Sequence, residues 1–219
     1  MNLRKFKLSE AGHMFTHYER GATTYSNSDV DTERSYLNKN YGPVRKDDNG
    51  NIVSQMDYLK YNLNTIDHVK RKDLVVMGNW IIDAPSNLPD RLHDRFFELS
   101  YDFMIDRYGR QSGFENPEDI CISAYRHRDE HTDHMHFSMM PIKADENGHQ
   151  RFIGKEVFNR DDLKTAHQDL QKYLADNGIK CSILNGKTKR DRNGRALSMR
   201  EFKAEMKRER ERSKERRRW

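Results

Sequence analysis

Apolar and polar positions along the chain follow the period of a strand in some segments and that of a helix in others. Residues 3–8 alternate apolar and basic side chains, as a half-buried strand does. Residues 74–82 are rich in β-branched residues and predict a central strand. Residues 120–125 and 135–140 are two further strand candidates, joined by a charged loop. The sequence therefore predicts a sheet to which both halves of the chain contribute.

Two longer segments carry apolar residues at spacings of three and four, which is the pattern of an amphipathic helix. They are residues 55–70 and 89–108, and the second begins with a proline suited to a first helical turn. Capping residues indicate two more helices, a short one after Ser9 and a longer one after Asn159. The polar stretch 23–43 is expected to be mostly loop.

Strands and helices are mixed along the chain, and hairpin signals occur among them. Asn147-Gly148, which follows the last strand candidate, is typical of a two-residue hairpin turn. We therefore expect an α/β fold with a mainly antiparallel central sheet flanked by helices.

The segment 199–219 differs in composition from the rest of the chain. Ser198 and Glu201 form the capping-box pattern that starts a helix, but residues 207–218 include no apolar side chain with which to pack. We expect a body, residues 1–198, followed by a basic, charged helical tail. Such an ending is typical of the start of a longer carboxyl-terminal region, through which the protein would dimerise.

The charge balance narrows what the body can bind. The 219 residues include 40 Lys or Arg and 35 Asp or Glu, a formal net charge of +5. Ten of the basic and five of the acidic residues fall in 199–219, so the tail carries the whole excess and the body is neutral. An anionic partner of the body must therefore be held by local patches or a metal.

Two further properties bear on location. No apolar run approaches the roughly 18 to 20 residues of a membrane-spanning helix, so no span is expected. The two cysteines, Cys121 and Cys181, are far apart, and there is no export signal, which favours a reducing cytoplasm.

Four of the ten histidines lie in one run of ten residues, HRDEHTDHMH, which starts at His127. His134 and His136 are two apart on a predicted strand, so their side chains point to the same face. A hairpin would bring His127 beside them, and three converging imidazoles form a metal site with open positions. The alternative is a solvated, charged hairpin without a metal. His131, in the loop, is expected to face solvent.

Two carboxylates in the same run, Asp129 and Glu130, could orient the imidazoles or act as a base. Imidazole ligands alone favour zinc. If phosphate oxygens complete the shell, Mn²⁺ or Mg²⁺ is favoured instead, and we expect one of these two.

Four stretches, including the histidine run, carry a family resemblance. In chain order they are GHMFTHYERG, SNSDVDTERSYLN, YRHRDEHTDHMHFSMMP and FNRDDLKTAHQDLQKYLADNG. Taken together they resemble the Mob/Pre family of plasmid mobilisation relaxases, MobV type, and the resemblance extends to about Ala204. It implies a relaxase-type (HUH-like) fold and a metal-dependent endonuclease and transesterase. Such an enzyme nicks one strand at a plasmid transfer origin, stays attached to the 5′ phosphate and later rejoins the strand.

The resemblance also implies roles for individual residues. His17, in the first stretch, matches a histidine nucleophile that replaces the tyrosine of most relaxases. Glu130 would hold the tautomer of His17 or take its proton, and Arg20 would pair with a phosphate. A surface salt bridge is the alternative for Arg20. Tyr25 is the alternative nucleophile, although a tyrosine more often packs or stacks on a base.

The chain departs from the family pattern at two points. Members usually carry proline before the second histidine of the cluster, where this chain has Asp133, which adds a negative charge near the metal. An Asn-Tyr-acid-Leu motif is expected after the Ser-x-x-Asn stretch, but here the run is Asn38-Lys39-Asn40-Tyr41, without the acid.

A basic loop, residues 185–197, is suited to phosphate contacts because it has asparagine–glycine pairs and a single acid. Plasmid DNA, single-stranded or as a hairpin at the transfer origin, is the expected partner. A non-cleaving DNA-binding or replication-control module and a metal-dependent phosphohydrolase are the alternatives. The candidate DNA-contacting side chains of the loop are Lys187, Lys189, Arg190, Arg192 and Arg195.

Overall fold

The protein is described by a computed structural model that covers residues 1–22, 25, 27, 29–183, 195, 201, 204 and 208. The chain divides into two compact units, Met1–Ile183 and Leu184–Trp219. The predicted boundary after Ser198 stays a prediction, because the residues on both sides of it lie outside this coverage. Glu201, Ala204 and Arg208 are helical, in keeping with a helical tail.

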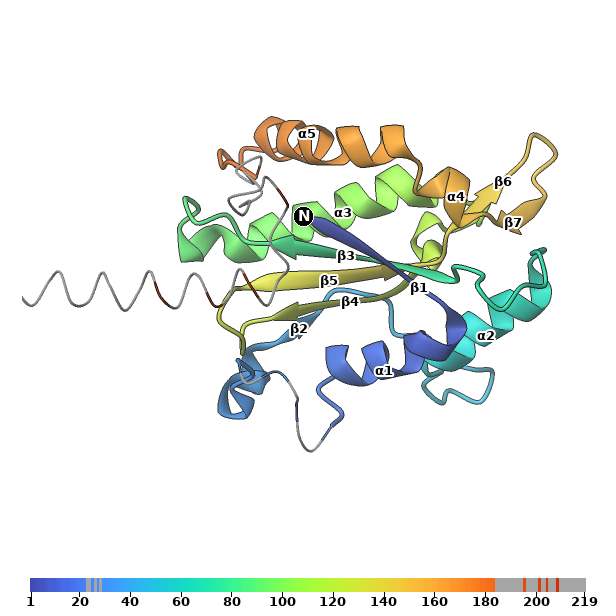
Figure 1. Cartoon of the computed structure of the whole chain (residues 1–219), viewed down its shortest axis with the longest axis horizontal. Helices are drawn as coiled ribbons and strands as arrows, with labels where there is room; N and C mark the ends of the chain where they lie inside the picture. The colour runs from blue at the N-terminus through green and yellow to red at the C-terminus, as the bar shows by residue number, and fades with distance from the viewer. Residues whose placement is uncertain are drawn as a thin grey trace, which may run out of the picture. The chain divides into compact units, whose positions relative to one another are not determined.

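The first unit is built on a mainly antiparallel sheet, as the sequence predicts. Its strands have the order β1-β3-β5-β4-β2, and each neighbouring pair is antiparallel (Figure 1). Consecutive strands in the chain are thus rarely neighbours in the sheet. The strands are β1 (Asn2–Phe6), β2 (Lys39–Asn40), β3 (Met77–Asp83), β4 (Cys121–His127) and β5 (His134–Met139).

Helices cover both faces of this sheet. Helices α3 (His93–Gly109) and α5 (Arg160–Asp176) lie on one face, and α1 (Leu8–Tyr18) and α2 (Gln55–Thr65) lie on the other (Figure 1). The shorter helices are η1 (Thr32–Leu37), η2 (Asp90–Leu92), η3 (Pro117–Ile120) and α4 (Gly154–Val157). In the part of the chain that is described, no helix is long and apolar enough to span a membrane.

The predicted hairpin and the longer capped helix are confirmed. Asn147-Gly148 turns between β6 (Ile142–Ala144) and β7 (Gln150–Phe152), and Gly148 has a φ of 81°, which favours glycine. The Asn159 side chain accepts hydrogen bonds from the first two acidic residues of α5. In contrast, α1 begins at Leu8 instead of after Ser9, and the backbone N–H of Lys7 donates to Glu10 (2.9 Å).

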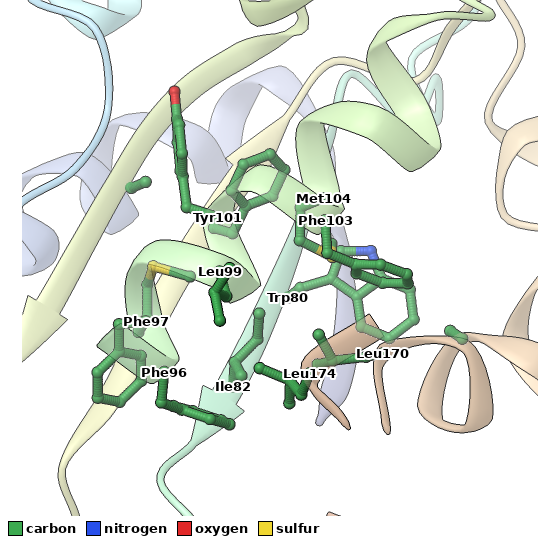
Figure 2. Close-up of a cluster of buried hydrophobic side chains, with 14 of the residues drawn as sticks. Trp80, Ile82, Phe96, Phe97, Leu99, Tyr101, Phe103, Met104, Leu170 and Leu174 are labelled. Carbon is green, nitrogen blue, oxygen red and sulfur yellow. The ribbon is translucent and has the colours of Figure 1, made fainter. Parts of the chain in front are cut away.

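The larger core lies between the sheet and the α3–α5 layer. Trp80 and Ile82 of β3 face this layer, where they meet Phe96 of α3 and Leu170 of α5 (Figure 2). Phe137 of β5 joins them, and its ring lies edge-on to that of Tyr101, with centroids 5.8 Å apart. Side chains along a strand alternate between the two faces of a sheet. The residues of β4 and β5 that do not face this core therefore point toward α1.

Candidate active site

The alternate residues of β4 and β5 bring the three clustered histidines together beneath α1. His127 is paired directly with His134, and His136 is paired with Tyr125, so all three imidazoles share a face. Their ring centroids are 4.9 to 5.4 Å apart, and Nε2 of His134 lies 3.1 Å from Nε2 of His136. All three residues are buried, whereas His131 is exposed, as expected.

The last turn of α1 places His17 above this cluster. The neighbouring Tyr18 is buried and its ring packs on His136, with centroids 4.6 Å apart. His17 itself lies edge-on to His127 and His136, at centroid distances of 5.5 and 5.6 Å. The residue matched to a nucleophile thus joins the residues matched to metal ligands, although more than a hundred positions separate them in sequence.

Hydrogen bonds to backbone carbonyls orient two of the clustered imidazoles. Nε2 of His127 donates to the carbonyl of Tyr18 (2.9 Å), and Nδ1 of His134 donates to the carbonyl of Thr132 (2.7 Å). The opposite ring nitrogens therefore keep free lone pairs. Nδ1 of His127 is buried and has no hydrogen-bond partner among the described residues. Fixed tautomers and an orphaned buried nitrogen are what metal-ligating histidines require, so the residues fit a divalent metal.

Glu130 joins the same group of side chains. Its Oε1 lies 3.8 Å from Nδ1 of His127 and 3.9 Å from Nε2 of His17. Candidate ligand atoms of His127, Glu130 and His134 lie within 4.8 Å of one another, and so do those of His17, His127 and His136. The carboxylate therefore faces both the candidate metal position and the candidate nucleophile.

Arg20 adopts a left-handed backbone conformation immediately after α1. Its φ is 57°, and no other described residue except glycines has a positive φ. This conformation costs a non-glycine residue roughly 1 kcal/mol. It turns the guanidinium inward, where it donates to Asp129 (2.7 and 2.8 Å) and to Glu130 (2.8 Å). It also donates to the backbone carbonyl of His17 (3.0 Å). Arg20 thus forms buried ion pairs rather than a surface salt bridge.

Asp129 anchors the segment that precedes β2. Its side chain is fully buried and accepts hydrogen bonds from Ser35 (2.6 Å) and Asn38 (2.8 Å) as well as from Arg20. Burial by itself would raise the pKa of Asp129, but these hydrogen bonds outweigh it and lower the pKa. Asp129 is therefore an anion that holds Arg20 beside the histidines. Sequence reasoning gave no role to Ser35, and the Ser-x-x-Asn spacing was the only signal for it.

Burial favours the neutral form of three imidazoles of the site, because it lowers the pKa of His17, His127 and His136. It is the largest cause of the lowered pKa of His17, and the charge of Arg20 lowers that pKa further, against the opposing effect of Glu130. Burial likewise lowers the pKa of His127 and of His136. A neutral imidazole is the form that can ligate a metal or attack a phosphorus atom.

Asp133 takes a different position from the one expected. Its carboxylate accepts two hydrogen bonds from Arg126 (2.8 and 2.6 Å) and lies 2.7 Å from Nδ1 of His93. Arg126 lies on the α3 face of the sheet, over the ring of Phe97 (4.7 Å). The added negative charge is thus neutralised by Arg126 instead of acting on the histidine cluster.

The remaining predicted site residues are placed only in part. Tyr25 lies beside Arg20, whose guanidinium carbon is 5.5 Å from the centre of the ring. In the basic loop, Arg195 is exposed and pairs with Glu201 (2.7 Å). Lys187, Lys189, Arg190 and Arg192 lie outside the described residues.

Comparisons with known proteins match most of the chain to one family. A family model described as "Plasmid recombination enzyme" (Mob_Pre) matches residues 1–204. A plasmid recombination enzyme of Streptococcus agalactiae is 31% identical over 81% of this chain and 34% of its own length. One of Lactiplantibacillus plantarum is 28% identical over 92% of this chain and 52% of its own length. The chain thus spans about a third to a half of these relatives.

Solved structures of the same family match the fold of this chain. A Mn-bound MobM relaxase domain (MOBV) in complex with oriT DNA of plasmid pMV158 superposes with a TM-score of 0.70 at 29% identity, covering 94% of this chain and 97% of that one. A second structure of the MobM relaxase domain, bound to a 26-nucleotide pMV158 oriT DNA, gives a TM-score of 0.59 at 25% identity and covers 92% of this chain and 97% of that one.

Proposed function

The chain belongs to the plasmid recombination enzyme family, and on that premise we propose that it is a plasmid mobilisation relaxase. It would nick and rejoin one DNA strand at a transfer origin, with Mn²⁺ or Mg²⁺ as cofactor. The observation that carries the proposal is the convergence of His17 with three buried imidazoles, two of which, those of His134 and His136, bring their Nε2 atoms to 3.1 Å of each other. A protein that only binds DNA has no need of such a set.

The proposed nucleophile is His17. One ring nitrogen attacks the scissile phosphorus, a P–N bond forms, and the bond from phosphorus to the 3′ oxygen breaks. The proton of the other ring nitrogen ends on the 3′ oxygen, so the products are a free 3′ hydroxyl and a phosphoramidate with a neutral imidazole ring and the single negative charge of the original phosphodiester. Attack by that hydroxyl in the reverse direction rejoins the strand.

Glu130 and Arg20 serve this step by their positions. Glu130 lies 3.9 Å from Nε2 of His17 and can carry the proton between the ring and the leaving oxygen. Arg20 donates hydrogen bonds both to Glu130 and to the backbone carbonyl of His17. It thereby holds the carboxylate of Glu130 beside the imidazole of His17. His127, His134 and His136 would hold the divalent metal, which when bound supplies Lewis-acid stabilisation of the phosphate charge.

Removal of the metal is expected to stop nicking while DNA binding persists. Protein treated with a chelator should relax supercoiled plasmid carrying its origin at least about 10²-fold more slowly, because the lost stabilisation amounts to several kcal/mol. Added Mn²⁺ should restore both relaxation and a protein-linked 5′ end. A product that is cut but free of protein would indicate a water-using phosphohydrolase, and chelator-resistant nicking would contradict the metal assignment.

The basic loop is proposed to contact DNA phosphates. Replacing Lys187, Lys189 and Arg190 with alanine should flatten the dependence of log affinity on log salt concentration for single-stranded origin DNA by about 2, at about 0.7 per lost contact. Fluorescence anisotropy at several salt concentrations measures this slope. The matched control replaces three exposed lysines on other elements and should leave the slope nearly unchanged; they are Lys60, Lys155 and Lys164. Equal slopes in the loop variant and the wild type would count against the loop.

Two broader assignments complete the proposal. Because its proposed substrate is plasmid DNA, we propose that the protein acts in the bacterial cytoplasm. The curated relatives extend well beyond the length of this chain, and a region of that kind would supply the dimer contact.

A further inference from the structure

Asn79 is a buried polar residue at the centre of the sheet, next to the histidine cluster. It is fully buried on β3 and stands directly opposite Ser138 of β5. Its Nδ2 lies 3.1 Å from Nδ1 of His136, and its Oδ1 accepts a hydrogen bond from Oγ of Ser138 (3.0 Å). Burying an amide in a strand is costly unless both of its ends are hydrogen-bonded, and here both are.

The amide determines where the proton of neutral His136 lies. When Nδ2 donates to Nδ1 of His136, the ring proton sits on Nε2, which faces Nε2 of His134 at 3.1 Å. A metal at this position needs a free lone pair on Nε2 of His136, so the proton must move to Nδ1. Asn79 must then present its oxygen to the ring, which a half-turn of the amide achieves.

Ser138 makes both orientations of the amide acceptable. A hydroxyl donates to Oδ1 in one orientation and accepts from Nδ2 in the other, so both ends of the amide stay hydrogen-bonded. The backbone carbonyls that orient His127 and His134 can only accept and therefore fix those rings in one tautomer. Among the hydrogen bonds that the described residues make to the three clustered histidines, the one from Asn79 to His136 comes from a side chain that suits both tautomers.

We propose that Asn79, supported by Ser138, is a positioning residue that presents the unprotonated Nε2 of His136 to the metal. The proposal rests on the metal site of the proposed function. Asn79 would raise the affinity of the site for the metal. Its effect on catalysis would be indirect, because it acts through His136.

The test measures Mn²⁺ affinity of the full chain by isothermal titration calorimetry, without DNA. Asn79→Leu keeps the branched shape of the side chain but removes both hydrogen bonds, and should weaken Mn²⁺ binding 10- to 100-fold, roughly the effect of losing such a partner of a ligand. Asn79→Asp offers only acceptors to Nδ1, so it favours the metal-ready tautomer and should bind Mn²⁺ at least as tightly as the wild type. This opposite pair of results separates positioning from a merely structural role.

Asn62→Leu is the matched control. Asn62 is also buried, but its side chain donates to the carbonyl of Tyr58 within α2 (2.9 Å), and the structure records no contact of it with the histidines. Its Mn²⁺ affinity should equal that of the wild type. If Asn79→Leu fails to fold, as judged by circular dichroism, Ser138→Ala provides the readout and should weaken binding several-fold.

Three results would overturn the proposal. The first is a wild-type Mn²⁺ affinity in folded Asn79→Leu, or in Ser138→Ala where that variant replaces it. The second is a loss of Mn²⁺ affinity in Asn62→Leu as large as the loss in Asn79→Leu. The third is equal weakening in Asn79→Leu and Asn79→Asp. Failure of the wild type itself to bind Mn²⁺ would instead reject the metal site of the proposed function, and this inference with it.

Discussion

Replacing His17 with alanine should abolish both strand nicking and the covalent protein–DNA adduct. Removing the nucleophile of a covalent mechanism costs at least about 10³-fold in rate, because no neighbouring group has both its position and its lone pair. Mn²⁺ and origin DNA should still bind within a few-fold of the wild type, since the three clustered histidines stay in place. Gel assays of supercoiled plasmid and of labelled origin oligonucleotides measure the two losses separately.

The chemistry of the adduct distinguishes His17 from the alternative nucleophile. A phosphoramidate is cleaved in acid, whereas a phosphotyrosine linkage survives, so the wild-type adduct should be lost on acid treatment. Tyr25→Phe serves as the control and should nick and form adduct at nearly the wild-type level. An acid-stable adduct, or one that persists in His17→Ala and disappears in Tyr25→Phe, would falsify the assignment.

Replacing Arg126 with methionine should destabilise the protein by about 3 to 5 kcal/mol, the cost of breaking a buried ion pair from one side. Arg126 is 2% exposed, and its guanidinium pairs with Asp133 and Asp94 while it stacks on Phe97. Without it, Asp133 loses two of the hydrogen bonds that lower its pKa against the opposing effect of burial. The free energy of unfolding from urea titration measures the loss.

A double variant tests whether the pair acts as a unit. Arg126→Met together with Asp133→Ala should be more stable than the sum of the two single changes predicts, because neither charge is left uncompensated. Asp106→Ala with Arg110→Met is the matched control, since this pair is exposed on α3 and at its end, and should change stability by less than about 1 kcal/mol. Additive losses at Arg126 and Asp133 would mean that each acts alone.

Local periodicity explains which features the sequence predicts well. The alternating segment recovers β1, because a half-exposed strand leaves a signal with a period of two. The apolar segments recover β3, β4 and β5 to within a few residues, because strands covered on both faces are apolar along most of their length. The same period puts His134 and His136 on one face, and the charged loop before them implies the hairpin that adds His127. The sequence also favours an antiparallel sheet, which the structure confirms.

Contacts between distant residues explain what the sequence does not reveal. The polar stretch 23–43 contains η1 and β2 because Asp129, some ninety positions later, binds Ser35 and Asn38. The pairing of Asp133 with Arg126 depends on which face of the sheet each side chain occupies. The position of Asn79 against His136 depends on the register of β3 and β5. None of these contacts leaves a pattern in the neighbouring sequence. The family motifs point to some of the residues that make them, such as Asn38, but not to the contacts between them.

The strand order β1-β3-β5-β4-β2 has a consequence for the protein during its synthesis. β5 lies between β3 and β4 and carries two of the clustered histidines, yet of these strands it leaves the ribosome last. His17 emerges far earlier, but it meets no imidazole partner until the β4–β5 hairpin is complete. Chains that stop before β5 therefore contain the proposed nucleophile but lack two of the three proposed metal ligands, His134 and His136. Under the proposed function, the capacity to nick DNA therefore arises only once β5 has been made.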